Sequence, residues 1–316
     1  MSPSVALAAL VLAAAPACGG ERGTVMTGFD GARAMAHVRK LVELGPRPAG
    51  SPALDRARAY LADELRGYGL TVREDRFTAR TPVGDLPMAN LVAERAGQRP
   101  EVIALAGHID TKRLAGFVGA NDSGSSTGVL LEAARVLAAG PPPPHTLWFV
   151  FFDGEEAVQE WTPTDSLYGS RHMVESLRAQ GTLARLRALV LLDMVGDRDL
   201  AIPRELNSTP WLLEAVREAA VRTGHARHFP DRVHAITDDH SPFLAAGVAA
   251  VDLIDFNYGS DARNPGPGGP ANAWWHTEAD TLDKVAPESL QVVGEVVLAA
   301  LPAISAGLTP PAAPAR

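Results

Sequence analysis

The sequence predicts an α/β fold, a three-layer sandwich in which helices cover a central, twisted sheet that is mixed but mostly parallel. Short apolar runs alternate along the chain with stretches of helical periodicity, and the inner runs are apolar throughout, as strands buried on both faces are. Hydrophobic residues make up 46% of the chain, enough for one core in a domain of about 280 residues.

The helices are expected where apolar residues return every three or four positions, at 32–44, 54–68, 124–139, 167–180, 211–223 and 285–301. Residues 71–79 alternate like a strand with one solvated face, and 90–94 form a further short strand. The inner strands are expected at 101–110, 146–152, 188–194 and 249–256. The loop 257–273 is rich in Gly, Pro and Asn and carries no periodicity.

Both ends of the chain fall outside the predicted catalytic domain, which spans 21–308. The apolar segment 5–17 suits a signal sequence and is too short to span a bilayer, so 1–20 are expected to be removed on export to the periplasm or the exterior. Cys18, the only cysteine, stands at a junction that resembles a lipoprotein cleavage site, and its acylation would attach the protein to a membrane. Simple secretion is the alternative. Residues 309–316 are expected to be a disordered tail.

The charge of the chain argues against nucleic acid as a partner. The net charge is -8, and the basic residues are scattered without a stripe or cluster. With a single cysteine, the domain must be stable without an internal disulfide. We expect a monomer.

Two adjacent carboxylates, Glu155 and Glu156, follow an apolar strand that ends at Asp153 and Gly154. In open α/β sheets, ligands bind outside the carboxyl ends of the strands. One glutamate can therefore hold a metal while its neighbour transfers protons. A solvated acidic turn is the alternative, but the residues that end other strands argue against it.

Side chains that can bind a metal end five separate segments and are expected to converge on one edge of the sheet. They are His108, Asp110, Asp122, Glu155, Glu156, Asp193 and His276. A catalytic zinc takes three protein ligands, from His nitrogen or carboxylate oxygen, and keeps one position open. Asp122, Glu156 and His276 would make such a set.

These residues lie in strings that resemble a known family. HID from His108, NDSGSSTG from Asn121, the Glu155–Glu156 pair, LLDMVGD around Asp193 and WHT from Trp275 are similar to the zinc-dependent M28 aminopeptidase superfamily. Three longer strings look like the glutaminyl-peptide cyclotransferases of animal type, the glutaminyl cyclases: FFDGEEAVQEWTPTDSLYGSRH, DDHSPFLAAGV and WWHTEADTLD. The resemblance covers nearly the whole domain.

The resemblance implies an enzyme that converts the N-terminal glutamine of peptides and proteins to pyroglutamate and releases ammonia. One Zn²⁺ on the three ligands named above would polarise the γ-carbonyl of the substrate. Glu155 would carry a proton from the attacking amine to the leaving ammonia. By the same resemblance, Asp193 and Asp238 would hydrogen-bond each other and Glu155, with a proton shared among the three acids.

The resemblance also implies the residues that receive the substrate. Trp161 and Trp275 would wall the pocket, although Trp275 could instead be a packing residue. Asp252 is placed with them because it stands where the animal enzymes carry a histidine, a departure that would alter proton sharing in the acid cluster. Asp238 could alternatively belong to a helix cap.

A secreted aminopeptidase with two zinc ions is the main alternative. His108 and Asp193 could hold a second zinc, bridged to the first by Asp122, and Glu155 would then activate a water for hydrolysis. A binding module that has kept the fold without activity is a third interpretation, which the presence of every catalytic residue type disfavours.

Overall fold

The computed structural model describes residues 28–259 and 272–308. The expected signal segment 1–20 with Cys18, the tail 309–316 and most of the loop 257–273 lie outside these residues.

Six strands form the central sheet, in the spatial order β1-β2-β4-β3-β5-β8. Their bounds are β1 Thr71–Thr81, β2 Gly84–Arg95, β3 Arg99–His108, β4 His145–Phe152, β5 Leu186–Asp193 and β8 Ala249–Ile254. The pairs β1/β2 and β2/β4 are antiparallel, whereas β4/β3, β3/β5 and β5/β8 are parallel. The predicted mixed, mostly parallel sheet is therefore confirmed.

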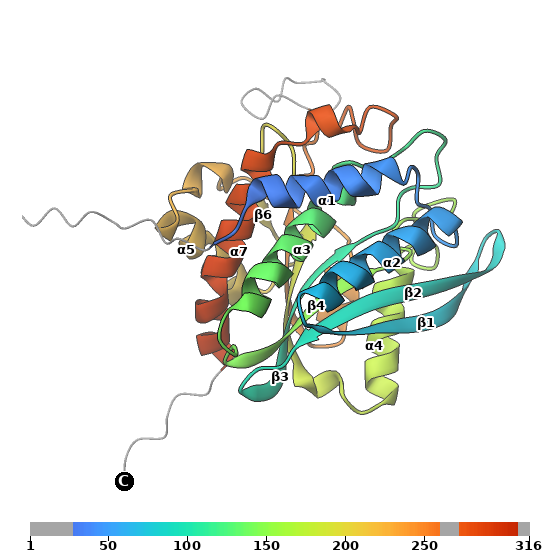
Figure 1. The fold of residues 1–316 in the computed structure, drawn as a ribbon. Coiled ribbons are helices and arrows are strands. Elements are labelled where there is room, and N and C mark those ends of the chain that lie inside the picture. The colour runs from blue at the N-terminus through green and yellow to red at the C-terminus, as the bar shows by residue number, and fades with distance from the viewer. Residues whose placement is uncertain (1–27, 260–271, 309–316) are drawn as a thin grey trace, which may run out of the picture.

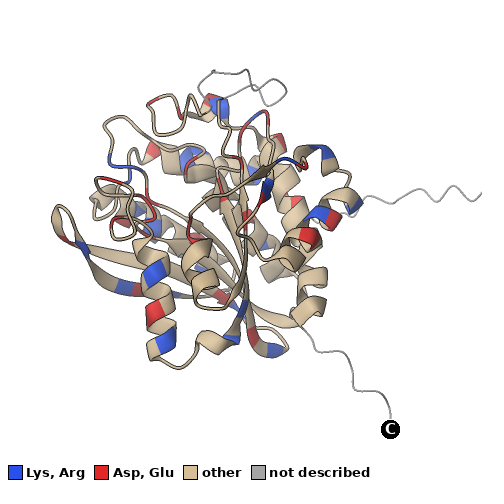
Figure 2. Ribbon diagram, turned by 180° about the vertical axis from the view of Figure 1, so that it is seen from behind, with Lys and Arg blue, Asp and Glu red and all other residues tan. Residues whose placement is uncertain are grey.

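Helices cover both faces of this sheet (Figure 1). One face carries α1 Gly31–Glu43, α2 Pro52–Gly67, α3 Gly124–Ala139, α5 Pro210–Arg222 and α7 Pro287–Leu308. The other face carries α4 Tyr168–Ala179 and α6 His240–Ala245. Lys and Arg are interspersed with Asp and Glu over these elements (Figure 2).

Strand β4 shows why the inner strands have unbroken apolar sequences. Every one of its residues is buried. Successive side chains of a strand point to opposite faces, so Phe149 and Phe151 pack in the core beneath α1 and α3 while Val150 and Phe152 pack against α4 and α6. The parallel strands end together at one edge, and the segments that follow them carry the residues of the site.

The apolar C-terminal helix α7 is a core helix. Its 22 residues and mean hydropathy of 1.6 would suffice to cross a membrane by length and composition. Within the described residues, however, Leu290, Val293, Val296 and Ala300 are fully buried in the main core, and the helix packs on α1, α3 and α5.

The structure departs from the sequence expectations where elements are polar or very short. Strand β2 begins at Gly84 instead of residue 90, because antiparallel pairing with β1 extends it through an exposed half that has no apolar pattern. Helix α6 has six residues, and the strands β6 Arg204–Glu205 and β7 Val233–His234 have two each. Such pieces are too short to show a periodicity.

A buried ion pair ties α2 to the segment that leads into the site. Arg58 Nη2 lies 2.5 Å from Asp153 Oδ2, and the two side chains are 6% and 0% exposed. Arg58 Nε also donates to the carbonyl of Ala89 at 2.9 Å, and Asp153 accepts from the N–H of Ala89 at 2.8 Å. Asp153 directly precedes Gly154 and Glu155, so this pair anchors the end of β4.

We predict that Arg58→Met lowers the free energy of unfolding by about 3–5 kcal/mol, because it leaves the Asp153 carboxylate buried without its partner. Urea unfolding followed by circular dichroism measures the loss. Arg66→Met is the matched control on the same helix: its pair with Asp63 is 55% and 80% exposed and should contribute less than about 1 kcal/mol. Equal losses in the two variants would contradict the prediction.

Candidate active site

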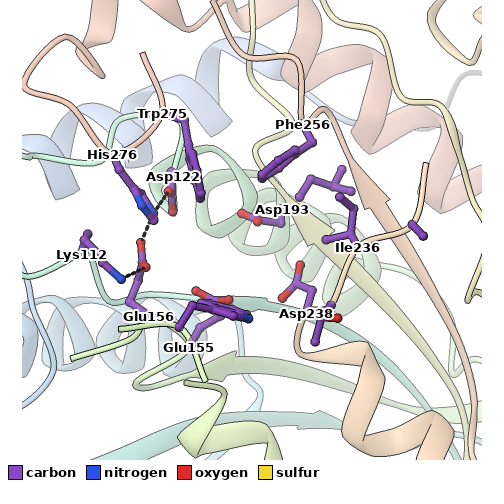
Figure 3. Close-up of a pocket in the computed structure, with 14 residues that line it drawn as sticks. Lys112, Asp122, Glu155, Glu156, Asp193, Ile236, Asp238, Phe256, Trp275 and His276 are labelled. Atoms are coloured by element: carbon purple, nitrogen blue, oxygen red, sulfur yellow. Dashed lines mark ion pairs between the residues drawn. The ribbon is translucent and has the colours of Figure 1, made fainter. Parts of the chain in front are cut away.

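A pocket of about 400 Å³ opens at the carboxyl ends of the parallel strands (Figure 3). Its acidic lining consists of Asp122, Glu155, Glu156, Asp193 and Asp238. Its aromatic and aliphatic lining includes Trp161, Trp275, Phe256 and Ile236. The pocket thus combines several carboxylates with apolar walls, and it contains eight of the nine side chains that the sequence assigned to catalysis, substrate or the first metal, together with Lys112.

The first predicted ligand set is assembled in this pocket. His276 Nε2 lies 2.9 Å from Glu156 Oε1 and 3.4 Å from Asp122 Oδ2, and ligand atoms of the three residues lie within 4.8 Å of one another. Both carboxylate oxygens of Glu156 are buried, and the contacts recorded for them among the described residues are ion pairs with His276 and Lys112. One His nitrogen with two carboxylates is a donor set that zinc prefers, so these residues fit the ion.

A second donor set shares Asp122 with the first. His108 Nε2 lies 3.2 Å from Asp122 Oδ1 and 3.3 Å from Asp193 Oδ1, and these three residues also offer ligand atoms within 4.8 Å of one another. Asp122 therefore turns one oxygen to His276 and the other to His108. This geometry is compatible with one metal ion or with two.

Buried carboxylates fix the main chain that carries the ligands. Asp110, at the end of β3, accepts from the N–H groups of Glu155 and Glu156 at 3.1 and 3.3 Å. Asp280 accepts from the N–H groups of Asn121 and Asp122 at 2.8 and 3.1 Å. Asp110 and Asp280 are fully buried. Asp110 thereby holds the segment after β3 to the segment after β4, and Asp280 holds the segment before α3 to the segment that carries His276.

A carboxylate that accepts main-chain N–H groups also shapes the rim of the pocket. Asp165 accepts from three consecutive N–H groups, those of residues 158–160, each at 2.9 Å, and from the hydroxyl of Tyr168 at 2.7 Å. These bonds close the turn that presents Trp161, which lines the pocket and is 44% exposed. On the opposite rim, Trp275 stacks on His276 with ring centroids 4.0 Å apart.

The three predicted catalytic acids all line the pocket but are not hydrogen-bonded as expected. Within the described residues, Asp193 bonds His108 instead of Asp238 or Glu155. Asp238 Oδ1 accepts from the N–H of Asp239 at 2.5 Å, and its Oδ2 has no hydrogen-bond partner. Carboxylates repel one another unless they share a proton, and the imidazole is the more favourable neighbour for Asp193.

The pKa values of four of the five acids that line the pocket are raised, and burial is the largest cause for each. Burial raises the pKa of Glu155 well above its usual range, and the charges of Glu156 and Asp238 raise it further. Burial and the charge of Asp193 raise the pKa of Asp238 to about 7. Such displaced pKa values mark groups that can exchange protons near neutral pH.

Two of the three proposed ligands, Asp122 and His276, behave differently, whereas burial and the charge of Asp122 raise the pKa of Glu156. Burial opposes ionisation of Asp122, but hydrogen bonds from His108 and His276 outweigh it and hold the pKa of Asp122 below its usual range. Burial likewise opposes a charge on His276, yet Asp122 and Glu156 raise its pKa to about 9. In the absence of a metal ion, the carboxylates thus favour a positive charge at this point of the pocket.

The structure does not support the expectation that Asp252 binds substrate. Asp252 is fully buried and does not line the pocket. It points to the α6 side of β8, where its Oδ2 lies 3.8 Å from His240 Nδ1. Ile254, two residues further along β8, points to the same face of the sheet, but it ends the strand and lines the pocket, whereas Asp252 lies deeper in the sheet. Asp238, which the sequence could also have placed in a helix cap, lines the pocket instead. The N-cap residue of α6 is its neighbour Asp239, whose side chain makes no cap hydrogen bond.

Sequence reasoning missed several residues that complete the site. Lys112 Nζ lies 3.6 Å from Glu156 Oε2, and Phe256 contacts the ring of Trp275 at 5.0 Å between centroids. The signal for Lys112 was its place two residues after Asp110 in the string HIDTK. Phe256 ends an apolar run and could not be distinguished from a core residue.

The chain is similar to proteins of known family. Residues 90–301 match the model of peptidase family M28. A glutaminyl-peptide cyclotransferase of Drosophila melanogaster is 30% identical over 278 residues, which cover 79% of this chain and 75% of the relative. A glutaminyl-peptide cyclotransferase-like protein of Mus musculus is 32% identical over 281 residues, covering 79% and 70%.

Solved structures show the same relationship. The crystal structure of an Acidobacteriales bacterium glutaminyl cyclase superposes with a TM-score of 0.82 at 40% identity, covering 88% of this chain and 96% of that one. A leucine aminopeptidase precursor from Bacteroides thetaiotaomicron has a TM-score of 0.75 at 27% identity, covering 86% and 97%. The resemblance drawn from the sequence strings is confirmed: the chain belongs to peptidase family M28 and, within it, to the glutaminyl-peptide cyclotransferases.

Proposed function

We propose that this chain is a zinc-dependent glutaminyl-peptide cyclotransferase that converts the N-terminal glutamine of peptides or proteins to pyroglutamate and releases ammonia. The observation that carries the proposal is the position of Glu155. Its buried carboxylate, with a raised pKa, lies next to Glu156 of the ligand set in a pocket walled by Trp161 and Trp275. This is the arrangement required for moving a proton beside a polarised carbonyl.

Asp122, Glu156 and His276 would hold the zinc ion. When bound, the ion supplies a Lewis acid that polarises the γ-carbonyl of the substrate glutamine. The chain's own residues do the rest. Trp161 and Trp275 enclose the glutamine side chain, so that it folds back with its α-amine facing its γ-carbon.

Glu155 serves as the proton carrier in both halves of the reaction. As the bond forms between the α-nitrogen and the γ-carbon, the Glu155 carboxylate takes a proton from that nitrogen. As the bond between the γ-carbon and the amide nitrogen breaks, Glu155 returns the proton to the departing nitrogen, which leaves as ammonia. The carboxylate ends the cycle unchanged, and no water is consumed.

Asp193 and Asp238 adjust the proton affinity of Glu155. Their negative charges, in a pocket of low dielectric constant, favour the protonated form of neighbouring carboxylates. Asp238 contributes directly to the raised pKa of Glu155. Asp193 acts on Asp238, whose pKa it raises.

Hydrolysis of N-terminal residues by a two-zinc aminopeptidase is the second candidate, and one observation favours it. The set of His108, Asp122 and Asp193 could hold another ion beside the first. In that case Glu155 would activate a water instead of an amine. The two functions differ in metal count and in product.

We also propose that the protein acts after export, outside the cytoplasm. This proposal rests on the apolar segment 5–17 and the Cys18 junction of the sequence. Peptides or proteins with N-terminal glutamine in that compartment would be its partners.

The first prediction concerns Glu155. Glu155→Gln should lower kcat by about 100- to 10,000-fold, because the amide cannot accept the proton of the attacking amine. Ammonia release and the matching mass loss from a Gln-initiated peptide measure cyclisation, and cleavage of Leu- and Ala-initiated peptides measures hydrolysis. Glu160→Gln, on the exposed turn before Trp161, is the control and should retain activity. Cleavage without cyclisation by the unmodified protein would favour the aminopeptidase.

The second prediction concerns the metal. Dialysis against a chelator should abolish cyclisation, and one equivalent of zinc should restore it. His276→Asn should weaken zinc binding by more than about 100-fold, beyond the effect of losing a residue outside the ligand set. His225→Asn is the control, since His225 pairs with Glu295 outside the pocket. Two equivalents of zinc for full activity would count against the one-zinc site.

The third prediction concerns pH. Asp238 raises the pKa of Glu155 by its negative charge, so Asp238→Asn should lower that pKa and enlarge the fraction of ionised Glu155 at a given pH. The acidic limb of the kcat profile, measured at saturating substrate, should then move to lower pH. Asp85→Asn, at an exposed position, should leave the limb in place. A shift to higher pH would show that another group controls it.

A further inference from the structure

A single carboxylate connects two of the segments that carry the proposed zinc ligands. Asp280 follows His276 by four residues and is fully buried. Its Oδ1 accepts from the N–H of Asn121 at 2.8 Å and its Oδ2 accepts from the N–H of Asp122 at 3.1 Å. The orientation of Asp280 therefore determines where the Asp122 backbone lies relative to the His276 segment.

A tyrosine from a third segment fixes that orientation. Tyr258, in the loop after β8, is fully buried, and its hydroxyl donates to Asp280 Oδ1 at 2.6 Å. Its ring packs edge-on against Trp274, two residues before His276, with centroids 5.3 Å apart. Trp274 in turn packs against the backbone of Gly259. Tyr258 thus contacts both sides of the His276 segment at once.

We infer that Tyr258 is a positioning residue of the proposed zinc site: its hydroxyl orients Asp280 and thereby sets the separation of Asp122 and His276. It lies outside the pocket lining. The inference rests on the proposed function for the zinc site, and it assigns a task to the first residues of the loop 257–273, which the sequence left without one.

The hydroxyl is needed because Asp280 is surrounded by fixed donors. Two main-chain N–H groups hold one oxygen each, and the tyrosine hydroxyl adds a second donor to Oδ1. A buried carboxylate with fewer donors turns toward whatever donor or cation remains available. The guanidinium of Arg47 is nearby and fully buried, and it bonds only main-chain carbonyls, including those of Val118 and Gly119. Without the tyrosine hydroxyl, the hydrogen bond from the Asp122 N–H to Asp280 would weaken.

Tyr258→Phe tests this inference, since it removes one oxygen atom and keeps the ring against Trp274. Zinc affinity is measured by competition with a chromophoric chelator, which requires no assumption about the reaction. The dissociation constant for zinc should rise by about 10- to 100-fold, the usual effect of losing a partner that orients a ligand. Cyclisation should recover when zinc is raised to saturation, with the KM for a Gln-initiated peptide unchanged.

Tyr60→Phe is the matched control. Tyr60 on α2 also loses one hydroxyl contact, to His37 Nδ1 at 2.5 Å, but it does not line the pocket and should leave zinc affinity unchanged. The melting temperature of both metal-free variants reports on folding. Asp280→Asn is the second variant, and it should weaken zinc binding at least as much as Tyr258→Phe, because the two N–H groups bond different oxygens of Asp280 and the NH2 group of Asn cannot accept.

The test of Tyr258 and the test of the proposed function have different outcomes. Unchanged zinc affinity in Tyr258→Phe would overturn the inference, as would a loss of affinity matched by Tyr60→Phe. If the unmodified protein binds zinc but forms no pyroglutamate, the proposed function fails while the affinity test of Tyr258 still stands.

Discussion

The site depends on buried carboxylates that accept main-chain N–H groups. Asp110, Asp165 and Asp280 each receive two or three such donors, and each donor left unpaired would cost about 1–3 kcal/mol. The segments that follow the strands therefore cannot move independently. Their fixed separation brings side chains from distant parts of the chain to within ligand distance of one another.

Carboxylates gathered in one place also repel one another. Asp122, Glu155, Glu156, Asp193 and Asp238 surround one small pocket, and like charges in a medium of low dielectric constant destabilise one another. Cations and shared protons relieve this repulsion. In the proposed function, a metal ion would relieve it on one side of the pocket, and protons exchanged among the acids would relieve it on the other. Metal binding and proton transfer would thus both follow from the excess of negative charge in this pocket.

The sequence predicted the inner strands from their apolar runs, and it predicted that Asp122, Glu156 and His276 lie close together, as they do. Helix α3 was predicted at 124–139, where it lies. Asp252 shows the limit of this reasoning: its place in an apolar run identified a strand, but not that the strand continues past it to Ile254, which is the residue that lines the pocket. The pairing of His108 with Asp193 depends on β3 lying beside β5, a contact between segments 85 residues apart that no local pattern encodes.

The two oxygens of Asp122 face two donor sets, and this has a consequence for regulation by metal supply. An ion on His108 and Asp193 would withdraw Asp193 from the acid cluster and neutralise charge that Asp238 and Glu155 require. Zinc in excess would then act as an inhibitor of cyclisation. The enzyme would then be active over a limited range of zinc concentration. Zinc would have to be high enough to fill the first donor set and low enough to leave the second set without a metal ion.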